Sequence, residues 1–101
     1  MSFDEKCYQL LQRVPEGRVT TYKELAEAVG IRAYRAVGQA MNRNPRLIKV
    51  PCHRVVCKNG EIGGYALGVK KKIELLQSEG VEIKGDRVVG MDGILYRFSS
   101  Q

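Results

Sequence analysis

A cysteine and a histidine stand side by side in the segment Pro51-Cys52-His53-Arg54, and His53 is the sole histidine of the chain. The thiolate is the reactive form of cysteine, and a neighbouring histidine, a cationic group or the start of a helical turn increases its population. All three influences are available here, because His53 and Arg54 follow the thiol and Pro51 suits the first position of a helical turn. The segment is therefore a candidate nucleophilic site.

The pair has requirements that the segment alone does not meet. Adjacent residues of a strand point to opposite faces, so Cys52 and His53 cooperate only in a turn or through a water that relays the proton. The histidine also needs an acid to orient it, and three glutamates follow downstream: Glu74, Glu79 and Glu82. Spacing alone favours a simpler alternative, a buried structural cysteine beside a hydrogen-bonded histidine.

The cysteines also bear on metals and redox state. Cys7, Cys52 and Cys57 are odd in number and show no Cys-x-x-Cys spacing, so we expect free thiols and a reducing compartment. Cys52, His53 and Cys57 are close in sequence, but structural zinc sites use four ligands and Cys7 falls on the core side of the first expected helix. We expect no metal site and no cofactor.

Positive charge is concentrated in the middle of the chain, whose formal net charge is +6. Residues 32–72 hold ten basic side chains against one acid, Glu61, whereas the rest of the chain holds seven basic and ten acidic ones. This distribution favours a face that binds a polyanion, with nucleic acid as the first candidate. The alternative is a basic surface that only keeps a small domain in solution.

Capping signals and apolar periodicity predict the elements around the cysteine. Ser2 with Glu5, and Thr21 with Glu24, have the spacing of capping boxes. The first box opens a helix to about residue 13, the second a helix that stops at Gly30, and a third helix follows over about residues 33–42. Two short helices joined by a tight turn predict a helix-turn-helix over about residues 22–42, whose second helix is presented to DNA.

The second half of the chain predicts short β elements and one more helix. Lys58, Asn59 and Gly60 separate the β-prone stretches 55–57 and 61–62, and Asn-Gly is a strong hairpin signal, so we expect a wing over about residues 55–65. A final helix is expected over about residues 69–79, and a C-terminal hairpin or tail over residues 81–101, turning at Gly85 and Asp86. The fold class expected is mostly α with small β hairpins, a single winged helix-turn-helix DNA-binding domain of residues 1–101.

The third helix is rich in small residues, which are Ala33, Ala36, Gly38 and Ala40. Gly38 costs ~1 kcal/mol relative to alanine in a helix interior, so its presence suggests close approach of the backbone to another helix or to a DNA groove. Arg35 projects from the same stretch. A tightly packed helix pair with a solvent-facing arginine explains the pattern equally well.

No feature of the sequence indicates a membrane protein. No apolar run approaches the ~18 to 20 residues that cross a bilayer, and the acidic N-terminus is unlike a secretory signal. We therefore expect a cytoplasmic protein with no membrane partner, associated with the nucleoid in a prokaryote or nuclear in a eukaryote.

Taken together, these segments resemble the C-terminal catalytic domain of the O6-alkylguanine-DNA alkyltransferases, suicide proteins that repair alkylated guanine. The resemblance covers roughly residues 3–80. The matching blocks are Gly17 to Tyr22, Arg35 to Met41 with Asn44-Pro45, Pro51 to Val56, Gly63 to Lys72, and Leu75-Leu76 with Glu79-Gly80. The usual member carries a further N-terminal domain, so this chain resembles a minimal version.

The resemblance implies a role for each candidate catalytic residue. Cys52 would accept the alkyl group, His53 would be the base that reaches it through a water, and Glu79 would orient His53. Asn44 would hold the turn that carries the cysteine. A further pair is implied to act on the leaving guanine: Tyr22 would donate a proton towards N3, with Lys72 assisting.

The resemblance also implies how DNA is bound. Arg35 would fill the gap left in the base stack, and the small residues of the third helix would admit it to the minor groove of double-stranded DNA that contains O6-alkylguanine. The DNA-binding residues implied are Arg35, Tyr22, Thr21, Ala33, Ala36, Gly38 and Arg43. Tyr34, beside Arg35, stands at a position where members of this family often have a small residue. The protein is expected to act as a monomer.

The pocket for the lesion is implied to be lined by Val55, Tyr65, Ala66 and Leu67. The Val55 carbonyl would accept a hydrogen bond from the guanine amino group, and the Ala66 amide would face O6. Leu67 replaces a residue that is commonly glycine, so we expect it to restrict bulky alkyl groups. The resemblance assigns no role to residues 81–101.

Two other functions remain open. A non-catalytic sensor of alkylated DNA, resembling the alkyltransferase-like proteins, would bind the lesion but commonly has tryptophan in place of the acceptor cysteine. A plain winged-helix regulator would have no use for Cys52 and His53 with a downstream glutamate. Cys52 favours the alkyltransferase.

Overall fold

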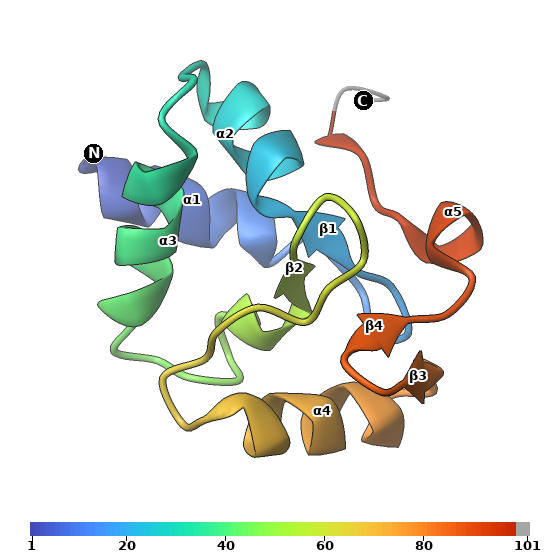
Figure 1. Cartoon of the computed structure of the whole chain (residues 1–101). Coiled ribbons are helices and arrows are strands. Elements are labelled where there is room, and N and C mark those ends of the chain that lie inside the picture. Colours follow the sequence, from blue (N-terminus) through green and yellow to red (C-terminus); the bar gives the residue numbers. More distant parts are fainter. Residues whose placement is uncertain (99–101) are drawn as a thin grey trace.

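The computed structural model describes residues 1–98 and is built mostly of helices, with two small sheets (Figure 1). The helices are α1 (Phe3–Leu11), α2 (Tyr22–Val29), α3 (Tyr34–Asn42), the short 3-10 helix η1 (Cys52–Arg54), α4 (Val69–Ser78) and α5 (Met91–Ile94). The strands are β1 (Thr20–Thr21), β2 (Val55–Val56), β3 (Ile83–Lys84) and β4 (Arg87–Val88). The predicted fold class, mostly α with small β elements, is confirmed.

Both predicted capping residues cap their helices. The Ser2 hydroxyl accepts a hydrogen bond from the Glu5 amide at 3.1 Å, and the Thr21 hydroxyl accepts one from the Glu24 amide at 3.0 Å. Helix α2 ends at Gly30, which has the left-handed conformation expected of a C-terminal cap, with φ at 93°. These local signals place α1 and α2 where the sequence predicts them, although α1 ends two residues before residue 13.

Helices α1, α2 and α3 pack against one another around the larger of two buried clusters. Cys7 and Leu11 of α1, Leu25 of α2 and Val37 of α3 are fully buried in it. Burial raises the pKa of the Cys7 thiol to about 11, so this cysteine is an inert core residue, as its position on α1 predicts. The helix-turn-helix α2–α3 therefore rests on α1.

The strand after η1 has a different partner from the one predicted. β2 pairs in parallel with β1, with Thr20 opposite Val55 and Thr21 opposite Val56, so it does not form a hairpin ladder with residues 61–62. The turn itself forms, since the Cys57 amide donates to the Glu61 carbonyl at 2.8 Å. Both valines of β2 are fully buried, and a strand buried in this way pairs inside the core, which a local turn signal does not reveal.

The C-terminal segment closes the other edge of β1. β3 and β4 form the predicted antiparallel hairpin, turning at Gly85 and Asp86, with Ile83 opposite Val88. The chain then passes through α5 and returns beside β1, where the Tyr96 amide donates at 2.7 Å to the carbonyl of Val19, the residue before β1. As Figure 1 shows, β1 and β2 lie between the helices α1–α3 and the part formed by α4, β3, β4 and α5.

No helix within residues 1–98 has both the length and the apolar character needed to span a membrane.

The loop that leads into η1 contains a residue in an unfavourable conformation. Ile48 has φ at 75°, and it is the only non-glycine residue with positive φ among residues 1–98. β-branched side chains rarely occupy this left-handed region because their Cβ substituents collide with the backbone. A hydrogen bond from the Val50 amide to the Arg46 carbonyl, at 2.9 Å, closes the turn around it. The tight turn before Cys52 is therefore kept at a cost in stability.

Replacing Ile48 by asparagine should relieve this cost. Asparagine tolerates the left-handed region, and the Ile48 side chain is 52% exposed, so Ile48→Asn should raise the free energy of unfolding by about 1 kcal/mol. Chemical denaturation measures the change. Ile48→Val keeps the β-branch and should give no gain. Equal stability of the two variants would contradict the interpretation.

Candidate active site

Cys52 is the first residue of η1 and lies at the wall of a pocket of about 370 Å³. Cys52 is only 4% exposed, and it lines this pocket. The pocket lies between α2, α3 and the loop before α4, and six residues predicted for the site or the DNA contact line it: Tyr22, Arg35, Gly38, Cys52, Tyr65 and Ala66. The structure thus brings together residues that are separated widely in the sequence.

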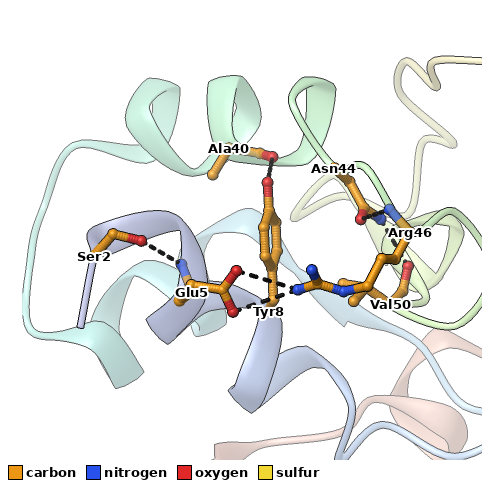
Figure 2. Close-up of polar contacts among 7 residues, drawn as sticks. All are labelled: Ser2, Glu5, Tyr8, Ala40, Asn44, Arg46 and Val50. Atoms are coloured by element: carbon orange, nitrogen blue, oxygen red, sulfur yellow. Dashed lines mark hydrogen bonds and ion pairs between the residues drawn. The ribbon is translucent and has the colours of Figure 1, made fainter.

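Asn44 holds the turn that carries the thiol, as the resemblance implies. Its amide nitrogen donates to the Val50 carbonyl at 2.8 Å and lies 3.4 Å from the Cys52 sulfur. Its amide oxygen accepts a hydrogen bond from the Arg46 backbone at 2.9 Å (Figure 2). Asn44 is buried, and its contacts with Val50 and with the Cys52 sulfur are both made away from bulk solvent.

His53 is paired with Glu79, one of the three downstream glutamates. The His53 Nε2 atom lies 2.9 Å from Glu79 Oε2, and the imidazole is fully buried. Arg54, which sequence reasoning assigned only a general positive charge, donates to both oxygens of Glu79 at 2.9 and 2.7 Å and to the Val14 carbonyl at 2.7 Å. Glu79 is the C-cap of α4, so this helix end is fastened to η1.

The electrostatics of Cys52 differ from those expected of an exposed reactive cysteine. Burial raises the pKa of its thiol, while the Asn44 hydrogen bond and the Lys72 charge act in the opposite direction. The net effect is a raised pKa, so the flanking positive charges do not by themselves ionise the sulfur. A nearby base must take the proton when the thiolate is needed.

His53 has the protonation state of such a base. Burial lowers the pKa of its imidazole, against the opposing influence of Glu79, and the ring is therefore neutral at pH ~7. Its Nε2 faces a carboxylate, which only accepts hydrogen bonds, so Nε2 carries the ring proton. The other nitrogen, Nδ1, is buried and has no hydrogen-bond partner among residues 1–98. Nδ1 is consequently free to accept a proton.

Tyr22 and Lys72 form a second polar group beside the pocket. The Lys72 Nζ atom lies 6.0 Å from the centre of the Tyr22 ring. Burial raises the pKa of the Tyr22 phenol to about 12, with the neighbouring Cys57 and Cys52 adding to the effect, so the phenol keeps its proton and is a donor. Burial lowers the pKa of the Lys72 ammonium to about 8.

Lys72 also ties three segments of backbone together. Its ammonium is fully buried and donates to the carbonyls of Val55 and Ile62, both at 2.6 Å, and of Gly64 at 3.1 Å. The Val55 carbonyl, expected to accept from guanine, accepts from Lys72. Neither Val55 nor Leu67 lines the pocket, and Leu67 is 53% exposed.

The residues expected at the DNA differ from one another in exposure and in contacts. Arg35 is exposed on α3, with Ala36 and Gly38 half-buried beside it. Thr21 is buried as the cap of α2, and Ala33 is the exposed residue before α3. A further one, Arg43, is engaged elsewhere: its guanidinium donates to both carboxylate oxygens of Asp4, each at 2.8 Å.

Four pocket residues were missed by sequence reasoning. Gln39, Met41 and Asn42 of α3, and Gly64 of the loop before α4, also line the cavity. Gln39 and Asn42 lie four and seven positions after Arg35, so helical periodicity from Arg35 would have found them. Within residues 1–98 no group of three or more histidine, cysteine, aspartate or glutamate side chains is arranged to hold a metal ion.

Comparison with known proteins identifies the family. The family model described as "6-O-methylguanine DNA methyltransferase, DNA binding domain" matches residues 2–81. The chain belongs to this family. It is also 51% identical over 83 residues to a methylated-DNA–protein-cysteine methyltransferase of Metallosphaera sedula, an alignment that covers 82% of this chain and 52% of that protein.

Solved structures of two similar proteins resemble this chain in sequence and in fold. The O6-methylguanine-DNA methyltransferase of Pyrococcus kodakaraensis is 49% identical with a TM-score of 0.74, over 80% of this chain and 47% of that one. Atl1 of S. pombe, in complex with damaged DNA containing O6-carboxymethylguanine, is 32% identical with a TM-score of 0.80, over 96% and 99% of the two chains. The winged helix-turn-helix class is thereby confirmed.

The family match refines one expectation from the sequence. The matching unit is described as a DNA-binding domain of the methyltransferase, not as its C-terminal catalytic domain. The chain spans about half the length of the Metallosphaera relative. What is shown is therefore a DNA-binding domain of this family.

The Glu79 pair makes the stability of the domain depend on pH in a defined direction. Although burial acts against it, hydrogen bonds from Arg54 and His53 hold the pKa of the Glu79 carboxyl below its usual range. A lowered pKa in the folded state contributes stability above the ordinary glutamate pKa of about 4.3, and this contribution is lost as the pH falls through the lower folded value.

Glu79→Gln should therefore be less stable than the parent by about 1–3 kcal/mol at neutral pH, with the difference shrinking at acid pH. Urea denaturation at pH values from ~7 to ~3 measures it. Glu74→Gln, exposed on the same helix, should match the parent throughout. A Glu79→Gln difference that stays constant across this range would contradict the assigned pairing.

Proposed function

We propose that this domain repairs double-stranded DNA that contains O6-alkylguanine, by moving the alkyl group irreversibly to its own Cys52. One observation carries the proposal: a buried cysteine opens into a pocket beside a neutral histidine that is oriented by Glu79, on a DNA-binding domain of the methyltransferase family. In this proposal the domain corresponds to the C-terminal catalytic part of the longer relatives and acts as a monomer.

The first step is extrusion of the lesion from the duplex. The alkyl carbon lies inside the base stack, so the nucleotide must rotate out, at a cost that is lowest for a poorly paired, damaged base. Arg35 is exposed at the mouth of the pocket and supplies the side chain that takes the place of the base. The half-buried Ala36 and Gly38 leave room for the minor groove to approach α3.

The second step is displacement at the alkyl carbon. His53 Nδ1 takes the proton of the Cys52 thiol through a water, and the imidazolium formed is stabilised by Glu79. The sulfur then bonds to the alkyl carbon while the bond from that carbon to guanine O6 breaks. The electron pair of the broken bond passes to the guanine ring, and the Tyr22 phenol donates its proton to N3. The His53 imidazolium then returns its proton through water to the Tyr22 phenolate, and guanine exchanges its N3 proton with water to recover the ordinary N1-protonated form. Unmodified guanine leaves, and the thioether remains on Cys52.

The near full-length match with Atl1 makes a lesion sensor without transfer activity the second candidate. A sensor needs the pocket and Arg35, but it needs no buried thiol held by Asn44 and no oriented base beside it. A plain winged-helix regulator needs neither the pocket with Arg35 nor the buried thiol with its oriented base. The hydrogen bond from Asn44 to sulfur and the pair between His53 and Glu79 therefore favour transfer.

Transfer predicts a single covalent change. Incubation with a duplex that contains one O6-methylguanine should raise the intact mass of the protein by one methyl group in place of one hydrogen, with no second addition on longer incubation. Mass spectrometry of the peptides locates the methyl on Cys52. Cys52→Ala should bind the duplex and gain no mass. Tight, lesion-selective binding of the parent with unchanged mass would support the sensor instead.

The role of Arg35 in extrusion predicts that its loss affects transfer from duplex DNA more than transfer from single-stranded DNA. Because only a stacked base leaves a gap to fill, Arg35→Ala should slow transfer from duplex DNA by roughly tenfold, equivalent to about 1.4 kcal/mol, and leave transfer from a single strand nearly unchanged. Arg32→Ala, which removes a nearby exposed charge outside the pocket, controls for general loss of DNA affinity. Equal slowing of both substrates by Arg35→Ala would refute its role in extrusion.

A further inference from the structure

Helix α1 is fastened to the segment that carries Asn44 by polar contacts as well as by apolar packing (Figure 2). The Tyr8 hydroxyl donates to the Ala40 carbonyl of α3 at 2.7 Å, in a buried hydrogen bond. Glu5 forms an ion pair with Arg46 at 3.2 Å. These contacts join residues more than thirty positions apart, so α1 fixes both the end of α3 and the loop that follows it.

Arg46 lies at the centre of this arrangement because its side chain and its backbone face different partners. A single guanidinium nitrogen, Nη2, lies 3.2 and 3.3 Å from the two carboxylate oxygens of Glu5. The guanidinium carbon lies 5.7 Å from the centre of the Tyr8 ring, within the range of a cation–π contact. The Arg46 amide meanwhile donates to Asn44 Oδ1, and its carbonyl accepts from Val50.

The hydrogen bond from Arg46 determines which way the Asn44 amide faces. With Oδ1 bonded to the Arg46 amide, Nδ2 is directed at the Val50 carbonyl and at the Cys52 sulfur. The opposite orientation would set the amide oxygen against the Val50 carbonyl, two acceptors facing each other. An Asn44 held in the observed orientation donates to the sulfur and favours its ionised form.

We propose that Arg46 is a positioning residue for the acceptor thiol: anchored on Glu5 and Tyr8 of α1, it holds the Asn44 amide in the orientation that donates to the Cys52 sulfur. The proposal rests on the proposed function only in naming Cys52 as the acceptor. It gives α1, which contributes no residue to the pocket lining, a part in setting the reactivity of the thiol.

Other groups also act on Cys52 and stay unchanged in the test. Lys72 faces it from α4, Tyr22 from α2, Tyr65 from the loop before α4, and His53 follows it in η1. Loss of the Arg46 charge would by itself also raise the midpoint, whereas loss of the Glu5 charge would lower it. An upward shift in Glu5→Gln as well as in Arg46→Gln is therefore a change in the contribution of Asn44.

The experiment measures the reactivity of Cys52 with iodoacetamide as a function of pH, without DNA. Peptide mass spectrometry separates Cys52 from Cys7 and Cys57. Arg46→Gln should move the midpoint of the Cys52 profile upward by roughly half a pH unit, which slows alkylation below the midpoint about threefold. Methyl transfer from O6-methylguanine in single-stranded DNA should slow by a similar factor.

A second ion pair of this chain provides a matched control. Arg87 and Glu61 lie 3.1 Å apart with side chains 53% and 46% exposed, against 44% and 45% for Arg46 and Glu5. Surface pairs of this kind contribute little to stability, so Arg46→Gln and Arg87→Gln should unfold at nearly the same denaturant concentration. Only Arg46→Gln should move the thiol midpoint, and equal shifts in both variants would overturn the proposal.

Replacing Arg46 by lysine tests whether the charge at this position, and not only its packing, sets the midpoint of the Cys52 profile. Because one nitrogen makes both contacts with Glu5, the ammonium of Arg46→Lys can replace it, and the parent midpoint should return. Glu5→Gln breaks the ion pair with Arg46 from the side of α1 and should also raise the Cys52 midpoint. This variant tests the proposal if Arg46→Gln does not fold. An unshifted midpoint in both Gln variants would overturn the proposal.

The outcome is also separable from that of the proposed function. A shifted thiol midpoint in a protein whose parent form transfers no methyl group would support the role of Arg46 and remove only the transferase assignment. Methyl transfer by the parent with no shift in the variants would remove only the role of Arg46.

Discussion

Burial of the Cys52–His53 pair is the constraint on which the rest of the molecule depends. A thiol and an imidazole taken out of water lose their hydration, and burial opposes the charged form of each. Each therefore needs a polar partner from elsewhere in the chain: Asn44 comes from the loop just after α3 and Glu79 from the C-terminal end of α4. The loop after α3 and the end of α4 therefore meet at this pair.

Lys72 extends the same constraint to the walls of the pocket. A buried ammonium without partners would be costly, and this one is satisfied by the carbonyls of Val55, Ile62 and Gly64. Those carbonyls belong to β2, the turn after it and the glycine loop that leads to Tyr65 and the pocket. One charge thus joins the strand that follows the thiol to the loop that faces it, and it also approaches the Tyr22 ring.

The sequence predicts the features whose causes are local and misses those whose causes are distant. Capping pairs and glycine stops placed α1, α2 and the last hairpin, because each depends on residues a few positions apart. The partner of β2 depends on burial between distant segments, so the Asn59-Gly60 turn signal suggested the wrong ladder. The pairing of Arg43 with Asp4, 39 positions away, was likewise not predicted. The raised pKa of Cys52 was missed because its main cause is burial.

The C-terminal segment supports the site indirectly, because it contacts the chain next to β1, which leads to Tyr22. Residues 82–98 lie beyond the region that the family model matches, and the resemblance gave them no role. Val19, the residue before β1, pairs with Leu95, and Arg18 donates to the carbonyls of Ile94 and Leu95 at 3.1 and 2.9 Å, so the edge of the chain is covered where β1 begins. An uncovered strand edge leaves backbone groups unpaired. Because β1 runs directly into the first residue of α2, the same pairing that satisfies this edge fixes the backbone from which Tyr22 enters the pocket.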